Sequence, residues 1–134
     1  MARSIEERLE ALRETAKRGA RNVRSDVASI EDWAEMAELV APAHREALGA
    51  IGLSFERNAE RLEGGADGAA PDAVRTALTE AAQQLRADMD RLEALGADAA
   101  SNEEAREAFD SLHVWIGKHV DWIETGIAAE EEQK

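Results

Sequence analysis

The sequence predicts an all-α protein in which four main helices form an antiparallel up-down bundle. Apolar side chains recur every three or four residues along most of the chain, which is the spacing of one helix face. Signals for helix starts interrupt this pattern, and no stretch alternates apolar and polar residues as a half-buried strand would. Short connections favour antiparallel neighbours, so we expect one bundle domain over residues 1–134.

The first helix is predicted over residues 5–24. The Ser4 hydroxyl can accept a hydrogen bond from a free backbone N–H of the first turn, and Glu7 can bond back to the serine N–H. At about 100° per residue, one face of this helix is apolar. The side chains of that face, which we expect to point inward, are Ile5, Leu9, Leu12, Ala16 and Val23.

The second helix is predicted over residues 30–63. Its start signal is weaker, because Ser29 is followed by the short acid Asp32 where a glutamate is usual. Pro42 lies inside the range, and a proline within a helix removes one backbone hydrogen bond and clashes with the preceding turn. We therefore expect a kink or a break near Ala41.

This second helix is also apolar on two roughly opposite sides. One side includes Ile30 and Phe55, and the other includes Met36, Leu39 and Leu53. A helix that is apolar all round is either central in its bundle or shared with another chain. We therefore predict a homodimer, with Met36, Leu39 and Leu53 as partner-binding residues.

The third helix is predicted over residues 71–95, because Pro71 suits a first turn and Gly96 supplies a stop. The fourth is predicted over residues 102–130, after the start signal at Ser101. Both carry one apolar face. The side chains expected to point inward are Val74, Leu78, Ala81, Leu85, Met89 and Leu92 in the third helix, and Phe109, Leu112, Ile116, Val120, Ile123 and Ile127 in the fourth.

The chain is strongly acidic and has no cysteine. Its 29 acidic and 16 basic residues give a formal net charge of -13, which disfavours general binding to nucleic acid or to an anionic membrane surface. Without cysteine, disulfides and thiolate metal sites are excluded. No apolar run reaches the roughly 20 residues of a membrane span, so we expect a cytoplasmic protein. The acidity serves either solubility, as in a salt-rich habitat, or a basic partner.

The charge is uneven along the chain. Residues 1–24 carry seven basic and four acidic side chains, and four of the basic ones form a stripe at steps of three and four. The stripe either pairs with the acidic remainder of the bundle or contacts an anion, and the first interpretation is favoured. Its members are Arg13, Lys17, Arg21 and Arg24.

Two of the three tryptophans lie together on the predicted fourth helix. Trp115, His119 and Trp122 are spaced four and three residues apart, on the flank of its apolar face. Either another helix covers them or they form a contact patch, since aromatic side chains commonly dominate interfaces. We name all three as candidate partner-binding residues.

Any histidine chemistry must use His44, His113 or His119, because the chain has no others. His44 falls on an apolar face near Pro42, where it could donate to a backbone carbonyl that the proline leaves free. The alternative is a small-ligand, haem or metal site in the bundle core that uses His44 with His113 or His119. His113 and His119 are six residues apart and cannot chelate one metal from a single helix. We expect neither a metal nor a cofactor.

The stretch 115–124 resembles the last helix of haemerythrins, in which a tryptophan, a ligand histidine four residues on and an acid five beyond it recur. The resemblance covers about ten residues and would carry over His119 and Glu124 only. That family also draws iron ligands from its preceding helices. Here the predicted third helix has no histidine, and Phe55 is not preceded by one. A di-iron site of the family type is therefore not expected.

Arg106 and His113 have a spacing that is similar to the arginine-histidine pair of HEPN-type helical ribonucleases. Glu107, directly after the arginine, fits poorly with attack on an anionic backbone. No phosphate loop, serine elbow or zinc-binding helix motif is present. We therefore predict no catalytic residues.

Together these observations predict a noncatalytic, acidic helical interaction protein that binds a basic or neutral protein partner as a homodimer. The alternative is a ligand-binding or metal-binding bundle built on His44, and a degenerate nuclease that uses Arg106 and His113 comes third. Neither nucleic acid nor a membrane is expected as a direct partner.

Overall fold

The computed structural model describes residues 4–35, 42–99 and 102–132; of residues 33–35 and 42–43 only the backbone is described. Within these ranges the protein is an all-α four-helix bundle, which confirms the predicted fold class. The helices are α1 (Ile5–Glu35), α2 (Pro42–Ala66), α3 (Pro71–Asp98) and α4 (Glu103–Glu132).

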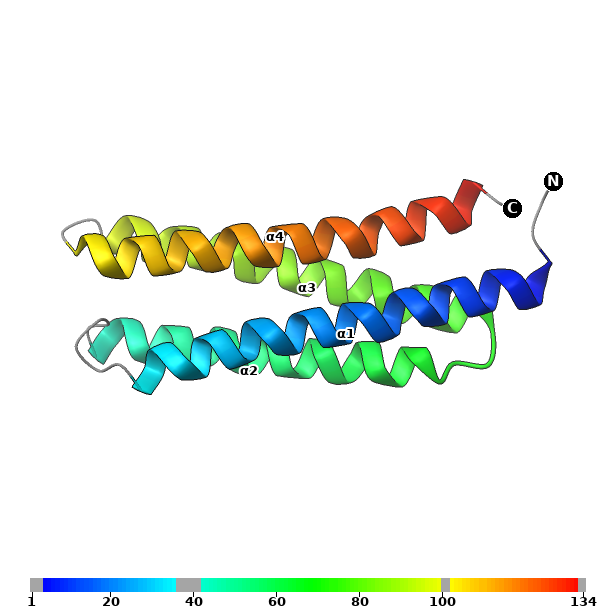
Figure 1. Cartoon of the computed structure of the whole chain (residues 1–134), viewed down its shortest axis with the longest axis horizontal. Helices are drawn as coiled ribbons and strands as arrows, with labels where there is room; N and C mark the ends of the chain where they lie inside the picture. Colours follow the sequence, from blue (N-terminus) through cyan, green and yellow to red (C-terminus); the bar gives the residue numbers. More distant parts are fainter. Residues whose placement is uncertain (1–3, 36–41, 100–101, 133–134) are drawn as a thin grey trace.

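Contacts between the helices show how they run. Between α1 and α4, Arg8 bonds Glu130 whereas Asp26 bonds His119, so residue numbers rise along one helix as they fall along the other. The same holds between α2 and α3, where His44 meets Asp98 and Arg61 meets Glu80. Neighbouring helices are thus antiparallel, and the start of α1 lies at the same end as the end of α4 (Figure 1).

The first helix is longer than predicted. It continues through Ser29, whose hydroxyl donates to the Ser25 carbonyl at 3.3 Å instead of capping a new helix. The predicted helix boundary near residue 24 is therefore wrong, because the acids after Ser29 do not interrupt an otherwise continuous helical pattern. The expected break near Ala41 lies outside the described residues. α2 begins at Pro42, a first-turn position that does not need the missing N–H.

Other helix ends follow local chemistry. The Ser4 hydroxyl accepts from the Glu7 N–H at 3.1 Å, as predicted. At the start of α4, the Asn102 side-chain oxygen accepts from the Ala105 N–H at 3.2 Å, and the predicted cap Ser101 lies outside the described residues. Gly96 does not end α3, because the helix continues to Asp98.

The core runs along the axis between the four helices. The predicted inward faces are buried or half-buried except at Ile5, which is 67% exposed at the first turn of α1. The largest side chains that are almost fully buried are Phe55, Phe109, Leu12, Leu48, Ile51, Leu62, Leu78, Leu85, Leu92, Leu112, Ile116 and Ile123. In the part of the chain described here, none of the helices combines the length and the apolar character that crossing a bilayer requires.

Candidate functional site: a pocket between α1 and α4

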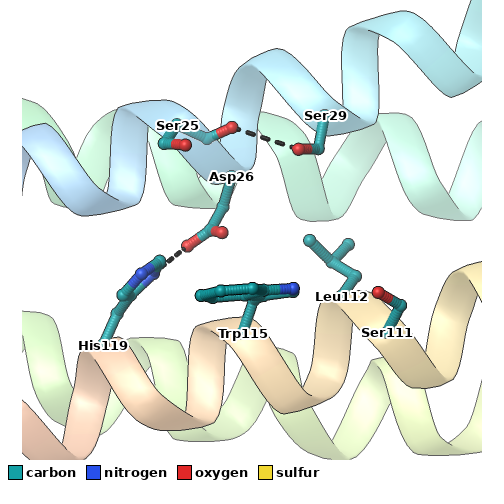
Figure 2. A pocket seen from close by; sticks show the side chains of 7 residues that line it. All are labelled: Ser25, Asp26, Ser29, Ser111, Leu112, Trp115 and His119. Atoms are coloured by element: carbon teal, nitrogen blue, oxygen red, sulfur yellow. Dashed lines mark hydrogen bonds and ion pairs between the residues drawn. The ribbon is translucent and has the colours of Figure 1, made fainter.

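A pocket of about 250 Å³ opens between α1 and α4, on the outer side of the core (Figure 2). Its residues repeat at steps of three and four along both helices, so each helix presents one edge to the pocket. The lining residues are Ser25, Asp26 and Ser29 from α1, with Ser111, Leu112, Trp115 and His119 from α4.

The pocket exists because small residues stand where the two helices would otherwise fill the space. Ser25, Ser29 and Ser111 extend only one heavy atom beyond Cβ. Leu112 is buried and closes the inner side against the core, whereas Trp115 is 53% exposed. The result is a hollow with a polar rim and an aromatic ring at its mouth.

Asp26 and His119 form a hydrogen bond across the pocket. His119 Nδ1 donates to Asp26 Oδ2 at 2.6 Å, and both side chains are largely buried. Burial raises the pKa of Asp26, although the hydrogen bond and the charge of His119 oppose that shift. The bond joins two residues that are 93 positions apart in sequence and lie on different helices, so it fixes the histidine ring against α1.

The second carboxylate oxygen of Asp26, Oδ1, has no hydrogen-bond partner in the described part of the chain. Figure 2 shows this oxygen turned away from His119, above the Trp115 ring. The Ser29 hydroxyl donates to the Ser25 carbonyl, and the hydroxyls of Ser25 and Ser111 have no hydrogen-bond partner in the described part of the chain. The pocket therefore offers one carboxylate oxygen and several hydroxyl groups to a ligand.

Both tryptophans of the candidate contact patch are exposed, whereas His119 between them is largely buried. The Trp115 ring lies 6.1 Å from the His119 ring, centroid to centroid, and the Lys118 ammonium lies 4.9 Å from the Trp115 centroid. Trp122, 36% exposed, lines a neighbouring hollow with Arg18. Of the two interpretations offered by the sequence, coverage by another helix of the same bundle is therefore wrong for Trp115.

The basic stripe of α1 pairs in part with the end of α2, as favoured. Arg24 forms an ion pair with Glu63, and the Arg13 guanidinium donates to the Gly68 carbonyl at 2.6 and 2.9 Å. A cation beside the carboxyl end of a helix is stabilised by the helix dipole.

Of the predicted histidine site, the structure separates His44 from His119. His44 Nε2 lies 3.2 Å from Asp98 Oδ2, so the expected bond to a backbone carbonyl is wrong. Its ring packs edge-on against Phe109 at 6.0 Å, and Phe109 precedes His119 by ten residues, about 15 Å along the helix. His113 is half-buried. Within the described residues, no three His, Asp or Glu side chains gather as a metal site would need.

The other candidate residues have different surroundings. Met36 and Leu39 lie outside the described residues, and Leu53 is 57% exposed on α2. Arg106 lies 4.0 Å from Asp110, one turn away on the same helix, and forms no hydrogen bond with a histidine in the described ranges.

The residues that resemble haemerythrins are engaged with protein groups. Glu124 accepts from Arg86 at 2.9 Å and His119 bonds Asp26, so each of the two side chains has its own protein partner. No protein-family model, curated protein or solved structure matches the chain.

Sequence reasoning found Trp115 and His119 but missed the α1 side of this pocket. The cause is the predicted helix end at residue 24, which left Asp26 in a connection. When the helix is extended by three turns, its inward face continues from Val23 to Ile30 and includes Asp26. A lone acid on an apolar face is the signal that would have identified the site.

Proposed function

We propose that this protein is a noncatalytic interaction protein that binds a basic protein partner on the α1–α4 face. The observation that carries the proposal is the exposed Trp115 at the mouth of a pocket that contains the Asp26 carboxylate. Tryptophan is enriched among the residues that dominate binding energy, and such anchors usually sit beside pockets. The tryptophan and the acid together favour a partner that brings a positive charge.

The surrounding charge supports a basic partner. In the first turns of α4, before the pocket, Glu103, Glu104, Glu107 and Asp110 are all exposed. Only Asp110 has an ion-pair partner in the described part of the chain, Arg106 at 4.0 Å. An acidic surface speeds association with a basic partner and makes the rate depend on salt.

The geometry of the pocket supports binding over catalysis. An Asp–His pair can orient a general base, but such a base acts on a nucleophile within about 2.6–3.2 Å. Among the described residues, no serine hydroxyl of the pocket hydrogen-bonds His119. Within the described part of the chain, the pair therefore has no hydrogen-bonded hydroxyl that could act as the nucleophile of a hydrolase.

We further propose that the protein is a homodimer that associates through α2 and α3. A groove of about 470 Å³ between these helices is lined mostly by small or apolar residues. Leu53, one turn from Ala50 of the groove, is 57% exposed. Arg91 and Asp98 border the groove. A twofold axis through the groove would place Arg91 of one copy beside Asp98 of the second copy. The groove lining is Ala47, Ala50, Ile51, Arg91, Ala94, Leu95 and Asp98.

The test compares two variants that each remove one exposed apolar side chain. Trp115→Ser changes the α1–α4 face, and Leu53→Ser changes α2 at a similar exposure, 57% against 53%. Each variant and the wild type would be immobilised and offered a lysate of the native organism at low salt. The same samples would be measured by light scattering at micromolar concentration.

We expect the wild type and Leu53→Ser to retain the same basic protein, and Trp115→Ser to lose it. We expect Leu53→Ser alone to become monomeric. Equal retention by the wild type and both variants would contradict the proposed face. A wild type that retains no protein at either low or high salt would contradict the interaction function, and a monomeric wild type would contradict the dimer.

A further inference from the structure

We infer that the α1–α4 pocket receives the guanidinium group of an arginine side chain that belongs to the protein partner. The inference rests on the proposed function and names the chemistry that its site would recognise. It is carried by three features of the pocket: the open carboxylate oxygen of Asp26, the flat ring of Trp115, and the number of acceptor groups around them.

The charge of the pocket favours a cation. Among the described residues Asp26 is the one acid that lines it, and it is only 4% exposed, so water cannot solvate its carboxylate fully. His119 satisfies one oxygen and leaves the other turned toward the pocket (Figure 2). A buried carboxylate that is raised in pKa by burial gains more from a charged hydrogen-bond donor than an exposed one does.

The shape of the pocket favours a planar group. In Figure 2 the Trp115 ring is seen edge-on, with one face turned toward Asp26. A flat cation stacked on that face, beside the carboxylate, would have the ring on one side and the carboxylate at its edge. Guanidinium stacks on aromatic faces and presents five N–H donors in a rigid fork. The Lys118 ammonium, 4.9 Å from the ring centroid, shows that this ring already accepts a cation as a neighbour.

The acceptors and the size fit the same group. Asp26 Oδ1 and the hydroxyls of Ser25 and Ser111 can each accept a hydrogen bond. Three separate acceptors match the spread N–H donors of a guanidinium group better than the compact ammonium group of a lysine. The pocket volume, about 250 Å³, lies below the range of roughly 300–1,000 Å³ typical of drug-sized ligands. It suits one side-chain end. An anion would meet Asp26, and an apolar group would strip water from the carboxylate without replacing its hydrogen bonds.

The test uses a blocked pentapeptide with one arginine between pairs of glycines, matched peptides with lysine or citrulline, and free L-arginine. Each would be titrated into the full chain while the side-chain N–H signal of Trp115 is followed by NMR. We expect the arginine peptide to bind saturably, the lysine peptide at least fivefold more weakly, and the citrulline peptide not at all. Equal binding of the lysine or citrulline peptide would overturn the assignment. Free L-arginine that binds more tightly than the peptide would overturn the choice of a protein partner.

Asp26→Asn is the decisive variant, because the amide oxygen can still accept from His119 while the charge is lost. We expect at least a tenfold loss of affinity for the arginine peptide. Asp90→Asn, at an exposed position of α3, changes the net charge equally and is expected to bind like the wild type. Affinity that is unchanged in Asp26→Asn would contradict the inference. If Asp26→Asn does not fold, Trp115→Leu at its exposed position carries the same expectation, with binding followed by the backbone N–H signals of Ser25 and Ser111.

The outcomes separate this inference from the proposed function. If Trp115→Ser loses a partner that the wild type retains, but the arginine peptide does not bind, then the interaction function stands and the guanidinium assignment fails. If the arginine peptide binds but no partner is retained at any salt concentration, then the pocket chemistry stands and the proposed function fails.

Discussion

The same two helices, α1 and α4, enclose two hollows that each contain a buried acid. One, of about 190 Å³, lies toward the chain ends and is lined by Arg8, Thr15 and Glu130 among others. The other, of about 250 Å³, is the pocket with Asp26 and His119. The two carboxylates have similar burial, but the groups that contact them differ, and so do the pKa shifts.

Both oxygens of Glu130 are satisfied by cations. Arg8 donates to Oε1 and Arg75, from α3, donates to Oε2 at 3.1 Å. Burial acts to raise the pKa of Glu130, but the hydrogen bonds and charges of Arg8 and Arg75 outweigh it and lower the pKa. Asp26 has one histidine and its pKa is raised. A buried acid with both oxygens paired ties helices together, whereas one with an open oxygen is available to a ligand.

The largest expected effect is that of Glu130→Gln, which removes the charge between two arginines. Removing one partner of a buried ion pair costs about 3–5 kcal/mol, and we expect about 2 kcal/mol because both guanidinium groups keep some solvent contact. Unfolding by urea, followed by circular dichroism, measures the change. Glu131→Gln, at an exposed position, is the control and should change the free energy of unfolding little. Equal effects of the two variants would contradict a tying role for Glu130.

The next effect concerns the close approach of the helices beside Glu130. A Cβ added at Gly126 would lie 2.7 Å from Thr15 Cγ2, and Thr15 is held by its hydrogen bond to the Ala11 carbonyl. We expect Gly126→Ala to lower the free energy of unfolding by about 1–2 kcal/mol, because overpacking outweighs the better helix propensity of alanine. Gly49→Ala, with open space around its Cβ, should instead raise it by about 0.5–1 kcal/mol. A stabilised Gly126→Ala would show that the two helices can separate there.

This contrast also explains what the sequence could and could not predict. Helix number, class and core faces follow from apolar spacing, which is a local property of each segment, and they agree with the structure apart from Ile5. The pairing of Asp26 with His119 spans 93 residues and depends on how α1 and α4 align. Ser29 with Asp32 was the misleading start signal, because a serine followed three residues later by an acid also occurs inside a continuous helix.

The third prediction compares how the contributions of Glu130 and Asp26 to stability change with pH. The folded pKa of Glu130 lies below its ordinary value of 4.5, so its stabilisation is complete above that value and is lost as the pH falls through the folded pKa. The folded pKa of Asp26 lies above 3.8, so its contribution is complete below that value and is lost as the pH rises through the folded pKa.

Urea unfolding from about pH 7 down to about pH 4 therefore has opposite expected trends for the two variants, each of order 1 kcal/mol or less. The advantage of the wild type over Glu130→Gln should shrink as the pH falls. The wild type should gain relative to Asp26→Asn over the same interval. Trends of the same sign would contradict the assignment of opposite pKa shifts to the two acids.

The smallest expected effect is that of Asp26→Asn on stability at neutral pH. The variant loses a carboxylate whose burial is unfavourable and keeps an oxygen that can accept from His119, so we expect a change within about 1 kcal/mol of the wild type. Asp90→Asn serves as the exposed control in the same urea experiment. A loss as large as that of Glu130→Gln would mean that Asp26 chiefly ties α1 to α4. A small change, together with lost binding of the arginine peptide, would separate the function of this acid from its part in the fold.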